Sequence, residues 1–199
     1  MTRDDLVALL AALLSLHEPA DAAEAADLER MRVWAETLGR PFSREQPDAH
    51  FTASAVVVDE AGERTLLVHH RKSGNWFQPG GHFEPGDASG AAAALREAGE
   101  ETGLAVAPAR PGLLDVDVHW VPWDGHYHLD LRFHLVAAGE LRPAAGELHA
   151  AAWLRWDDAL ARISEPALRR ALAKARSPDR ARAGRSPSVR AAAGSRRTG

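Results

Sequence analysis

The 199-residue sequence contains no cysteine and no long hydrophobic run. Without cysteine the protein has no disulfide framework, no thiolate metal site and no cysteine nucleophile. The most apolar stretch, residues 6–16, spans only eleven residues and follows two aspartates rather than a basic segment. It is too short to cross a membrane and unlike a secretory signal, so we expect a cytoplasmic protein without a membrane partner.

The rest of the composition is that of a globular protein with an uneven charge distribution. Hydrophobic residues make up 45% and charged residues 26% of the chain, which suffices for one substantial domain with extensions. The net charge of −4 hides an asymmetry, because residues 169–199 carry ten Lys or Arg and one Asp, a net charge of +9. Residues 1–168 therefore carry −13 and repel anions at long range.

Hydrophobic periodicity and turn residues predict an α/β fold with a mixed sheet. We expect one domain over residues 49–176, a helical extension over 1–48 and a disordered basic tail over 177–199. The positive charge of the tail would suit binding to a nucleic acid or an acidic partner, but we favour a segment that only increases solubility. The expected helices are 4–17, 20–38, 89–102, 157–162 and 165–176, and the expected strands are 51–59, 65–70, 113–121, 126–138 and 150–156.

The first two expected helices form an N-terminal pair. Five leucines of the first helix fit one helical face; they are Leu6, Leu9, Leu10, Leu13 and Leu14. We expect this face to pack against the domain, with a homodimer contact as the alternative.

Three carboxylates crowd the end of the helix expected at 89–102. Glu97, Glu100 and Glu101 are spaced i, i+3, i+4, so they share one face, with neighbouring Cβ atoms about 5–6 Å apart. Their charges repel one another and oppose the helix macrodipole. A hard divalent cation, which takes carboxylate oxygens, would offset this cost. A solvated acidic face at a helix end is the alternative.

The residues around these carboxylates favour the cation. Gly80 and Gly81 let the backbone approach a ligand closely before the helix begins. Arg96 lies four residues before Glu100 and can brace it, and Gly103 suits the end of the helix. Either Asp87 or Ser89 can cap the beginning of the helix.

Residues 81–104 resemble the Nudix box, G-x5-E-x7-R-E-U-x-E-E-x-G-U, where U is a bulky apolar residue. The matching positions are Gly81, Arg96, Glu97, Glu100, Glu101, Gly103 and Leu104. The segment departs from the motif at three points. Asp87 replaces the first glutamate, eight rather than seven residues separate it from Arg96, and Ala98 occupies the bulky apolar position. These departures leave the three metal-binding glutamates in place.

The resemblance implies an α/β/α sandwich that hydrolyses the pyrophosphate linkage of a nucleoside diphosphate joined to another group. Glu97, Glu100, Glu101 and the backbone of Gly81 would hold Mg²⁺ or Mn²⁺, Arg96 would orient the carboxylates, and Gly80 and Gly81 would approach the small-molecule substrate. The lack of cysteine counts against the isomerase branch of the family. A catalytically silent binding or regulatory module is the alternative, but the complete acidic triad speaks against it.

Two strands after the box alternate polar and apolar residues. The alternation places Asp115, Asp117 and His119 on one face of the first strand and His126, His128, Asp130, Arg132 and His134 on one face of the second. A half-exposed antiparallel strand shows the same alternation. Because histidine and arginine suit phosphate oxygens, we expect Arg132 and His128 to line a substrate cleft beside the box helix.

Two further patterns were weighed for binding. Arg71, in the basic cluster 69–72, is a candidate phosphate contact and equally fits a solvated strand end. His126 and His128 match the H-x-H of cupin metal sites, but no clear glutamate and histidine follow at the spacing of that motif, and the flanking helices do not suit a β-barrel.

Overall fold

The computed structural model describes residues 2–143 and 148–177. A mixed sheet forms its centre, with strand order β3-β2-β1-β7-β5, and β4 pairs with β1, β6 with β7 and β8 with β2. Strands β1 and β7 are parallel and the other pairs are antiparallel. The strands are β1 (Ala49–Asp59), β2 (Arg64–His70), β3 (Trp76–Phe77), β4 (Gly80–His82), β5 (Ala105–Pro108), β6 (Asp115–Val121), β7 (His126–Ala138) and β8 (Leu148–Arg155).

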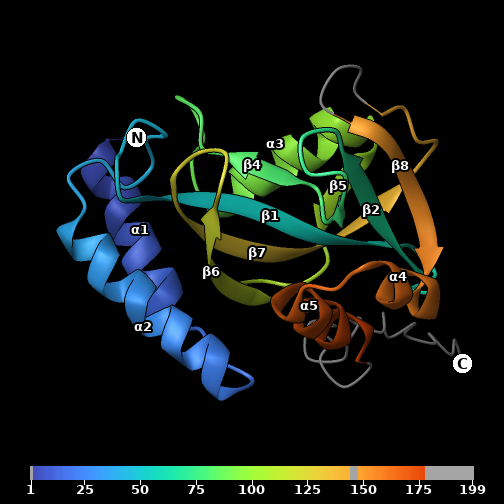
Figure 1. Cartoon of the computed structure of the whole chain (residues 1–199), viewed down its shortest axis with the longest axis horizontal. Helices are drawn as coiled ribbons and strands as arrows, with labels where there is room; N and C mark the ends of the chain where they lie inside the picture. Colours follow the sequence, from blue (N-terminus) through green and yellow to red (C-terminus); the bar gives the residue numbers. More distant parts are fainter. Residues whose placement is uncertain (1, 144–147, 178–199) are drawn as a thin grey trace, which may run out of the picture.

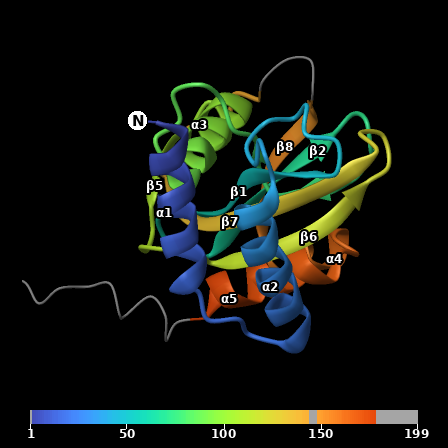
Figure 2. The ribbon, with the colours of Figure 1, turned by 90° about the vertical axis from the view of Figure 1, so that its left-hand side faces the viewer.

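Helices cover both faces of this sheet (Figures 1 and 2). The helices are α1 (Arg3–Ser15), α2 (Ala22–Thr37), α3 (Gly90–Thr102), α4 (Trp156–Arg162) and α5 (Pro166–Arg176). Helix α3 packs small residues such as Ala94 against the side of β1 and β7 that carries Phe51 and Leu131. Helices α4 and α5 pack Trp156 and Leu168 on the opposite side. The predicted α/β sandwich with a mixed sheet is confirmed.

The predicted N-terminal helical pair is present and packs into the domain core. Thr2 caps α1 in a capping box, and Asp21 caps α2. Leu10 and Leu14 of α1 join the same buried cluster as the apolar side of β1 and β7. Leu9, expected on the same helical face, is 49% exposed. The first helix therefore buries a narrower stripe than the sequence indicates.

A buried ion network holds β6 between α2 and α5. Glu24 of α2 is fully buried and binds Lys174 of α5 and His17, whose Nε2 lies 2.7 Å away. Lys174 and Arg170 in turn bind Asp115 of β6, at 3.0 and 2.8 Å. Burial alone would raise the pKa of Glu24, but hydrogen bonds from His17, the Ala20 amide and Lys174 outweigh it and hold the pKa below its ordinary value. Breaking such a buried network costs far more than losing a surface pair.

Three short strands complete the sheet beyond those expected from the sequence. Strands β3, β4 and β5 contain two, three and four residues, too few to show a periodic pattern. The tail expected over 177–199 lies outside the described residues except for Ser177. No helix among the described residues is both long and apolar enough to traverse a bilayer.

Candidate functional site

The site is built around the carboxyl half of α3, and local sequence sets where this helix begins and ends. Ser89 caps its first turn by accepting a hydrogen bond from the Ala92 amide at 3.1 Å. Gly103 ends it in a left-handed conformation with φ of 70°, and its amide donates to the Gly99 carbonyl. A side chain at 103 would be strained there. The carboxylates therefore lie in the last two turns of the helix.

Arg96 is the centre of the carboxylate cluster. Its Nη1 donates to Glu97 Oε1 and to Glu100 Oε2, each at 3.0 Å, and its Nη2 donates to the His82 carbonyl at 2.8 Å. Its Nε and Nη2 bind both oxygens of Asp87 at 3.2 and 3.0 Å. The hydrogen bonds to Asp87 are the largest of several that raise the pKa of Arg96. Asp87, the weak point of the motif, thus fixes the arginine that braces the glutamates.

The two glycines before α3 face two of the three glutamates. The Gly80 amide donates to Glu101 Oε2 at 3.0 Å. A Cβ atom added at Gly81 would lie 2.6 Å from Glu97 Oε1. Glu101 is buried and Glu97 partly buried, whereas the side chain of Glu100 is 60% exposed. Burial raises the pKa of Glu97 more strongly than Arg96 lowers it.

In the basic cluster 69–72, His70 rather than Arg71 lies near the carboxylates. His70 Nε2 lies 3.9 Å from Glu101 Oε1. Arg71, the candidate phosphate contact, is exposed, and its Nε donates to the Leu148 carbonyl at 2.8 Å. The structure therefore places Arg71 beside β8, and His70 is the member of the cluster closest to the carboxylates.

Arg132 does not lie where the sequence placed it. Its side chain is 1% exposed and faces the side of the sheet opposite α3. Its Nη2 lies 2.8 Å from Asp117 Oδ2, its Nε 3.0 Å from Asp130 Oδ2 and its Nη1 3.4 Å from Asp115 Oδ1. Glu165 is a fourth carboxylate, 3.7 Å away. A buried guanidinium that is paired with four carboxylates is not open to a phosphate, so the structure places Arg132 away from the expected substrate contact.

His128 shares the face of Arg132 and lies opposite α3, not beside it. The alternation of β6 and β7 was predicted correctly, because Asp117 pairs with Asp130 and His119 with His128 across the two strands. Gln78 connects the polar face of β7 to the segment that leads into the box. Gln78 Nε2 donates to Ser54 Oγ and Asp130 Oδ2 at 3.0 and 3.1 Å, and Gln78 lies two residues before Gly80.

Sequence reasoning missed several of these residues. Glu165 lies in the connection between α4 and α5, where no periodic pattern marks it, and burial raises its pKa. Ser54 lies within the strand predicted over 51–59, and Gln78 lies in the segment that leads into the box. Alternation within β1 was the one available signal, since Thr52 and Ser54 interrupt an otherwise apolar run.

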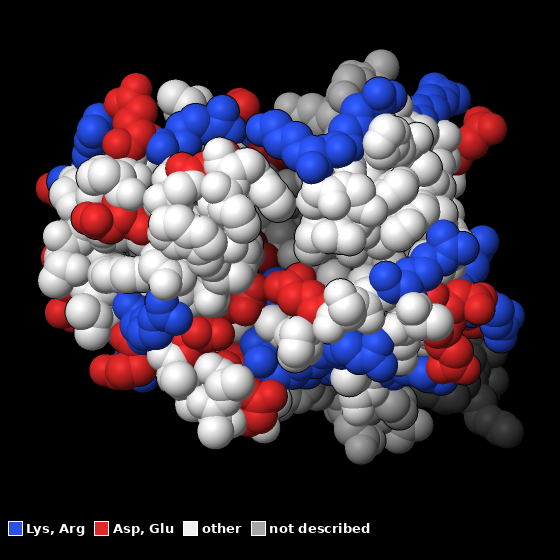
Figure 3. Space-filling model, viewed as in Figure 1, with Lys and Arg blue, Asp and Glu red and all other residues white. Residues whose placement is uncertain are grey.

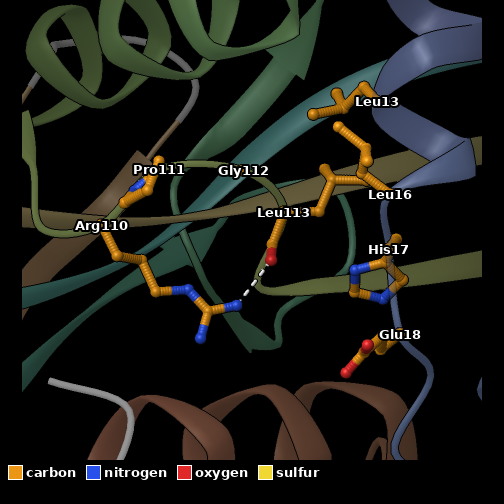
Figure 4. A pocket seen from close by; sticks show the side chains of 8 residues that line it. All are labelled: Leu13, Leu16, His17, Glu18, Arg110, Pro111, Gly112 and Leu113. Atoms are coloured by element: carbon orange, nitrogen blue, oxygen red, sulfur yellow. Dashed lines mark hydrogen bonds between the residues drawn. The ribbon is translucent and has the colours of Figure 1, made fainter. Parts of the chain in front are cut away.

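A separate pocket is lined by residues outside the box (Figure 4). It has a volume of about 310 Å³ and lies between the end of α1 and the segment before β6, where the Leu113 carbonyl accepts a hydrogen bond from Arg110. Its lining residues are Leu13, Leu16, His17, Glu18, Arg110, Pro111, Gly112 and Leu113. No box residue contributes to it, so we do not assign it to the chemistry of the carboxylates.

The two glycines provide a local test of this arrangement. Gly81→Ala should lower activity by up to about a hundredfold with little loss of stability, because the new Cβ would displace only the flexible end of Glu97. In Gly80→Ala the Cβ would lie 2.6 Å from the Ser54 Cα, so that variant should lose stability instead. Activity assays and thermal unfolding separate the two. Equal activity of Gly81→Ala and the parent would contradict the placement of Glu97.

Comparison with known proteins agrees with this geometry. A family profile described as the NUDIX domain matches residues 48–175, which includes the sheet, the box and both C-terminal helices. A comparison with curated proteins gave no match.

Solved structures share the fold. A NUDIX-family hydrolase from Clostridium perfringens is 26% identical, with a TM-score of 0.53, and the match covers 63% of this chain and 95% of that one. A MutT NUDIX hydrolase from Burkholderia pseudomallei is also 26% identical, with a TM-score of 0.51 and coverage of 64% and 98%.

A third structure shows the fold alone. The NUDIX domain of Shewanella oneidensis NrtR, crystallised with ADP ribose, is 18% identical, with a TM-score of 0.53 and coverage of 63% and 85%. The match over residues 48–175, the hydrolase structures and the box carboxylates agree. The chain therefore belongs to the NUDIX domain family and is a Nudix-type pyrophosphohydrolase, an enzyme that hydrolyses phosphate anhydrides.

Proposed function

We propose that this enzyme cleaves the diphosphate linkage of a nucleoside diphosphate joined to another group, with Mg²⁺ or Mn²⁺ held by Glu97, Glu100 and Glu101 and by the backbone of Gly81. The observation that carries this proposal is the close approach of Gly80 and Gly81 to the carboxylates of Glu101 and Glu97. At position 81 only glycine leaves room for this approach, because a Cβ atom would lie 2.6 Å from Glu97 Oε1.

The residues present fit a hard divalent cation. The donors are carboxylate oxygens, which Mg²⁺ and Mn²⁺ prefer. Glu97 is desolvated, so its pKa is raised, and a cation would stabilise its charged form. When bound, such a cation would neutralise the negative charge of diphosphate oxygens and lower the pKa of a bound water.

The side chains around the cluster orient it. Arg96 holds Glu97 and Glu100 through one nitrogen and is itself fixed by Asp87. The Gly80 amide fixes Glu101 Oε2 and leaves Oε1 on the side of His70. We therefore assign Arg96 as a positioning residue.

The face that carries α4 and α5 has side chains of both charges around a hollow (Figure 3). Figure 3, which shows the side that carries α4 and α5, is hollowed near its middle, with Lys and Arg side chains along the upper rim and Asp and Glu side chains below. Because residues 1–168 are strongly acidic, local cations must offset the repulsion of a diphosphate.

A substrate panel tests the proposal. Phosphate release is measured from nucleotide sugars, dinucleotides and nucleoside triphosphates, each with Mg²⁺ and with Mn²⁺. Metal-dependent cleavage of a nucleoside diphosphate derivative supports the proposal. Tight binding of one nucleotide with no cleavage of any would favour a silent binding module. Cleavage of triphosphates alone would contradict the proposed substrate class.

A further inference from the structure

Five histidines gather on the sheet face opposite the box helix. His50 of β1 is the register partner of His128 of β7, and His82 of β4 pairs with Thr52, two residues further along β1. The ring centroids of His50 lie 4.7 Å from His128 and 4.9 Å from His82, and those of His82 and His128 are 5.1 Å apart. His126 and His119 complete the group at 5.5 and 5.7 Å from His128.

This cluster contains buried nitrogens without hydrogen-bond partners. His50 is fully buried, and neither of its ring nitrogens has a partner among the described residues. The Nε2 atoms of His126 and His128 are likewise buried without a hydrogen-bond partner among the described residues. Buried polar groups are nearly always hydrogen-bonded, and each exception destabilises the fold. A packed core of histidines therefore leaves unexplained polar atoms that a ligand would satisfy.

We propose that His50, His82 and His128 bind a divalent transition metal of the zinc class, separate from the Mg²⁺ or Mn²⁺ proposed at the box. One ligand nitrogen from each histidine lies within 4.8 Å of the others. Nitrogens around a tetrahedral zinc are about 3.4 Å apart, so small side-chain rotations would close the site. Imidazole ligands select zinc-class metals, whereas carboxylates select Mg²⁺.

The surroundings of the three histidines suit a bound cation. Burial lowers the pKa of His50 to about 3, with further contributions from neighbouring cationic groups. The His50 imidazole is therefore neutral at neutral pH and keeps the lone pair that a metal needs. Asp124, in the loop before β7, has Oδ2 3.5 Å from His128 Nε2. It forms an adjoining group of potential ligands with His126 and His128.

One neighbour competes with the metal. Arg44 Nη2 donates to His82 Nδ1 at 2.8 Å. Arg44 is exposed and belongs to the segment before β1, so its guanidinium can withdraw into solvent when a cation takes that lone pair. A second cluster of Asp117, His119 and Glu165 also brings ligand atoms together, but Arg132 already neutralises it.

The two proposed metal sites lie on opposite sides of the same short strand. Gly81 faces Glu97 on the α3 side, and the next residue, His82, faces His50 and His128 on the other. A cation at the histidines would join β1, β4 and β7 and thereby fix the strand that carries the box glycines. Its effect should therefore appear in stability as well as in metal content.

Metal content tests this proposal without relying on turnover. Untagged protein is stripped with a chelator, equilibrated with Zn²⁺ at pH 7.5 and measured for bound zinc per chain. Glu97→Gln removes a box ligand, and one zinc per chain should remain in it. In that background His50→Gln or His128→Gln should weaken zinc binding by about a hundredfold or more. His134→Gln, on the same face of β7 but outside the cluster, is the matched control and should keep the zinc.

Two further readouts keep the test decisive. Co²⁺ should give the visible absorption of a nitrogen-ligated ion in Glu97→Gln and lose it with His50→Gln. At a hundredfold excess of zinc over Kd the Tm should rise by about 5–10 °C. If His128→Gln fails to fold, the partly exposed His82→Gln replaces it. The proposal is overturned if zinc binding survives these histidine substitutions, if Glu97→Gln abolishes all of it, or if His134→Gln loses it equally.

Discussion

Replacing Glu97 with glutamine should lower turnover by about 10²–10⁴-fold while the protein stays folded, because the change removes several kcal/mol of transition-state charge stabilisation. Glutamine keeps the volume of the side chain and can still accept the hydrogen bond that Arg96 Nη1 donates at 3.0 Å. Only the negative charge is lost. The effect should thus fall on catalysis and metal affinity rather than on packing.

The measurement is a titration of kcat with Mg²⁺ and with Mn²⁺ on whichever diphosphate the parent enzyme cleaves. Glu101→Gln should behave similarly, since Glu101 also faces the box glycines. Glu36→Gln, an exposed carboxylate of α2, is the matched control and should retain full activity. Full metal-dependent activity in both Glu97→Gln and Glu101→Gln would remove the carboxylates from the mechanism.

The carboxylate site could be predicted from the sequence because its geometry is local. The spacing of Glu97, Glu100 and Glu101 fixes their shared face through the helix repeat alone. Ser89 and Gly103 mark the bounds of the helix through capping rules that act within four residues. Even Asp87 contacts Arg96 from only nine residues away.

The polar sheet face could be predicted only in part, because its partners come from distant segments. Alternation shows that Asp117 and Arg132 share a face, but not which layer covers it. That layer is α5, which brings Arg170 and Lys174 to Asp115 from 55 and 59 residues away. The histidine cluster depends on the parallel register of β1 and β7, which pairs His50 with His128 and has no signal in either strand. The sequence therefore indicates a polar face and leaves its function open.

Arg132→Met should destabilise the protein by about 3–5 kcal/mol and leave substrate affinity nearly unchanged, the reverse of what a phosphate contact would show. Methionine matches the length of the arginine stem but leaves Asp115, Asp117 and Asp130 buried without their shared cation. Arg40→Met is the control, because Arg40 pairs with Glu45 at the surface, where such pairs contribute about 0–1 kcal/mol. Urea unfolding gives the free energies, and KM is compared at a temperature where both variants are folded.

The pH dependence of the stability lost in Arg132→Met distinguishes the loss of the ion pairs from poor packing of the methionine side chain. Burial would raise the pKa of Asp117, but Arg132 and His119 outweigh it and hold the pKa below its ordinary value. This depressed pKa stabilises the parent above the unfolded pKa of about 3.9 and stops doing so as the pH falls. Without Arg132, protonation of the buried carboxylates instead stabilises the folded state of the variant. The difference between parent and variant should thus be largest near pH 7 and narrow toward pH 4. If Arg132→Met instead raised KM and left the free energy of unfolding unchanged, Arg132 would be a substrate contact.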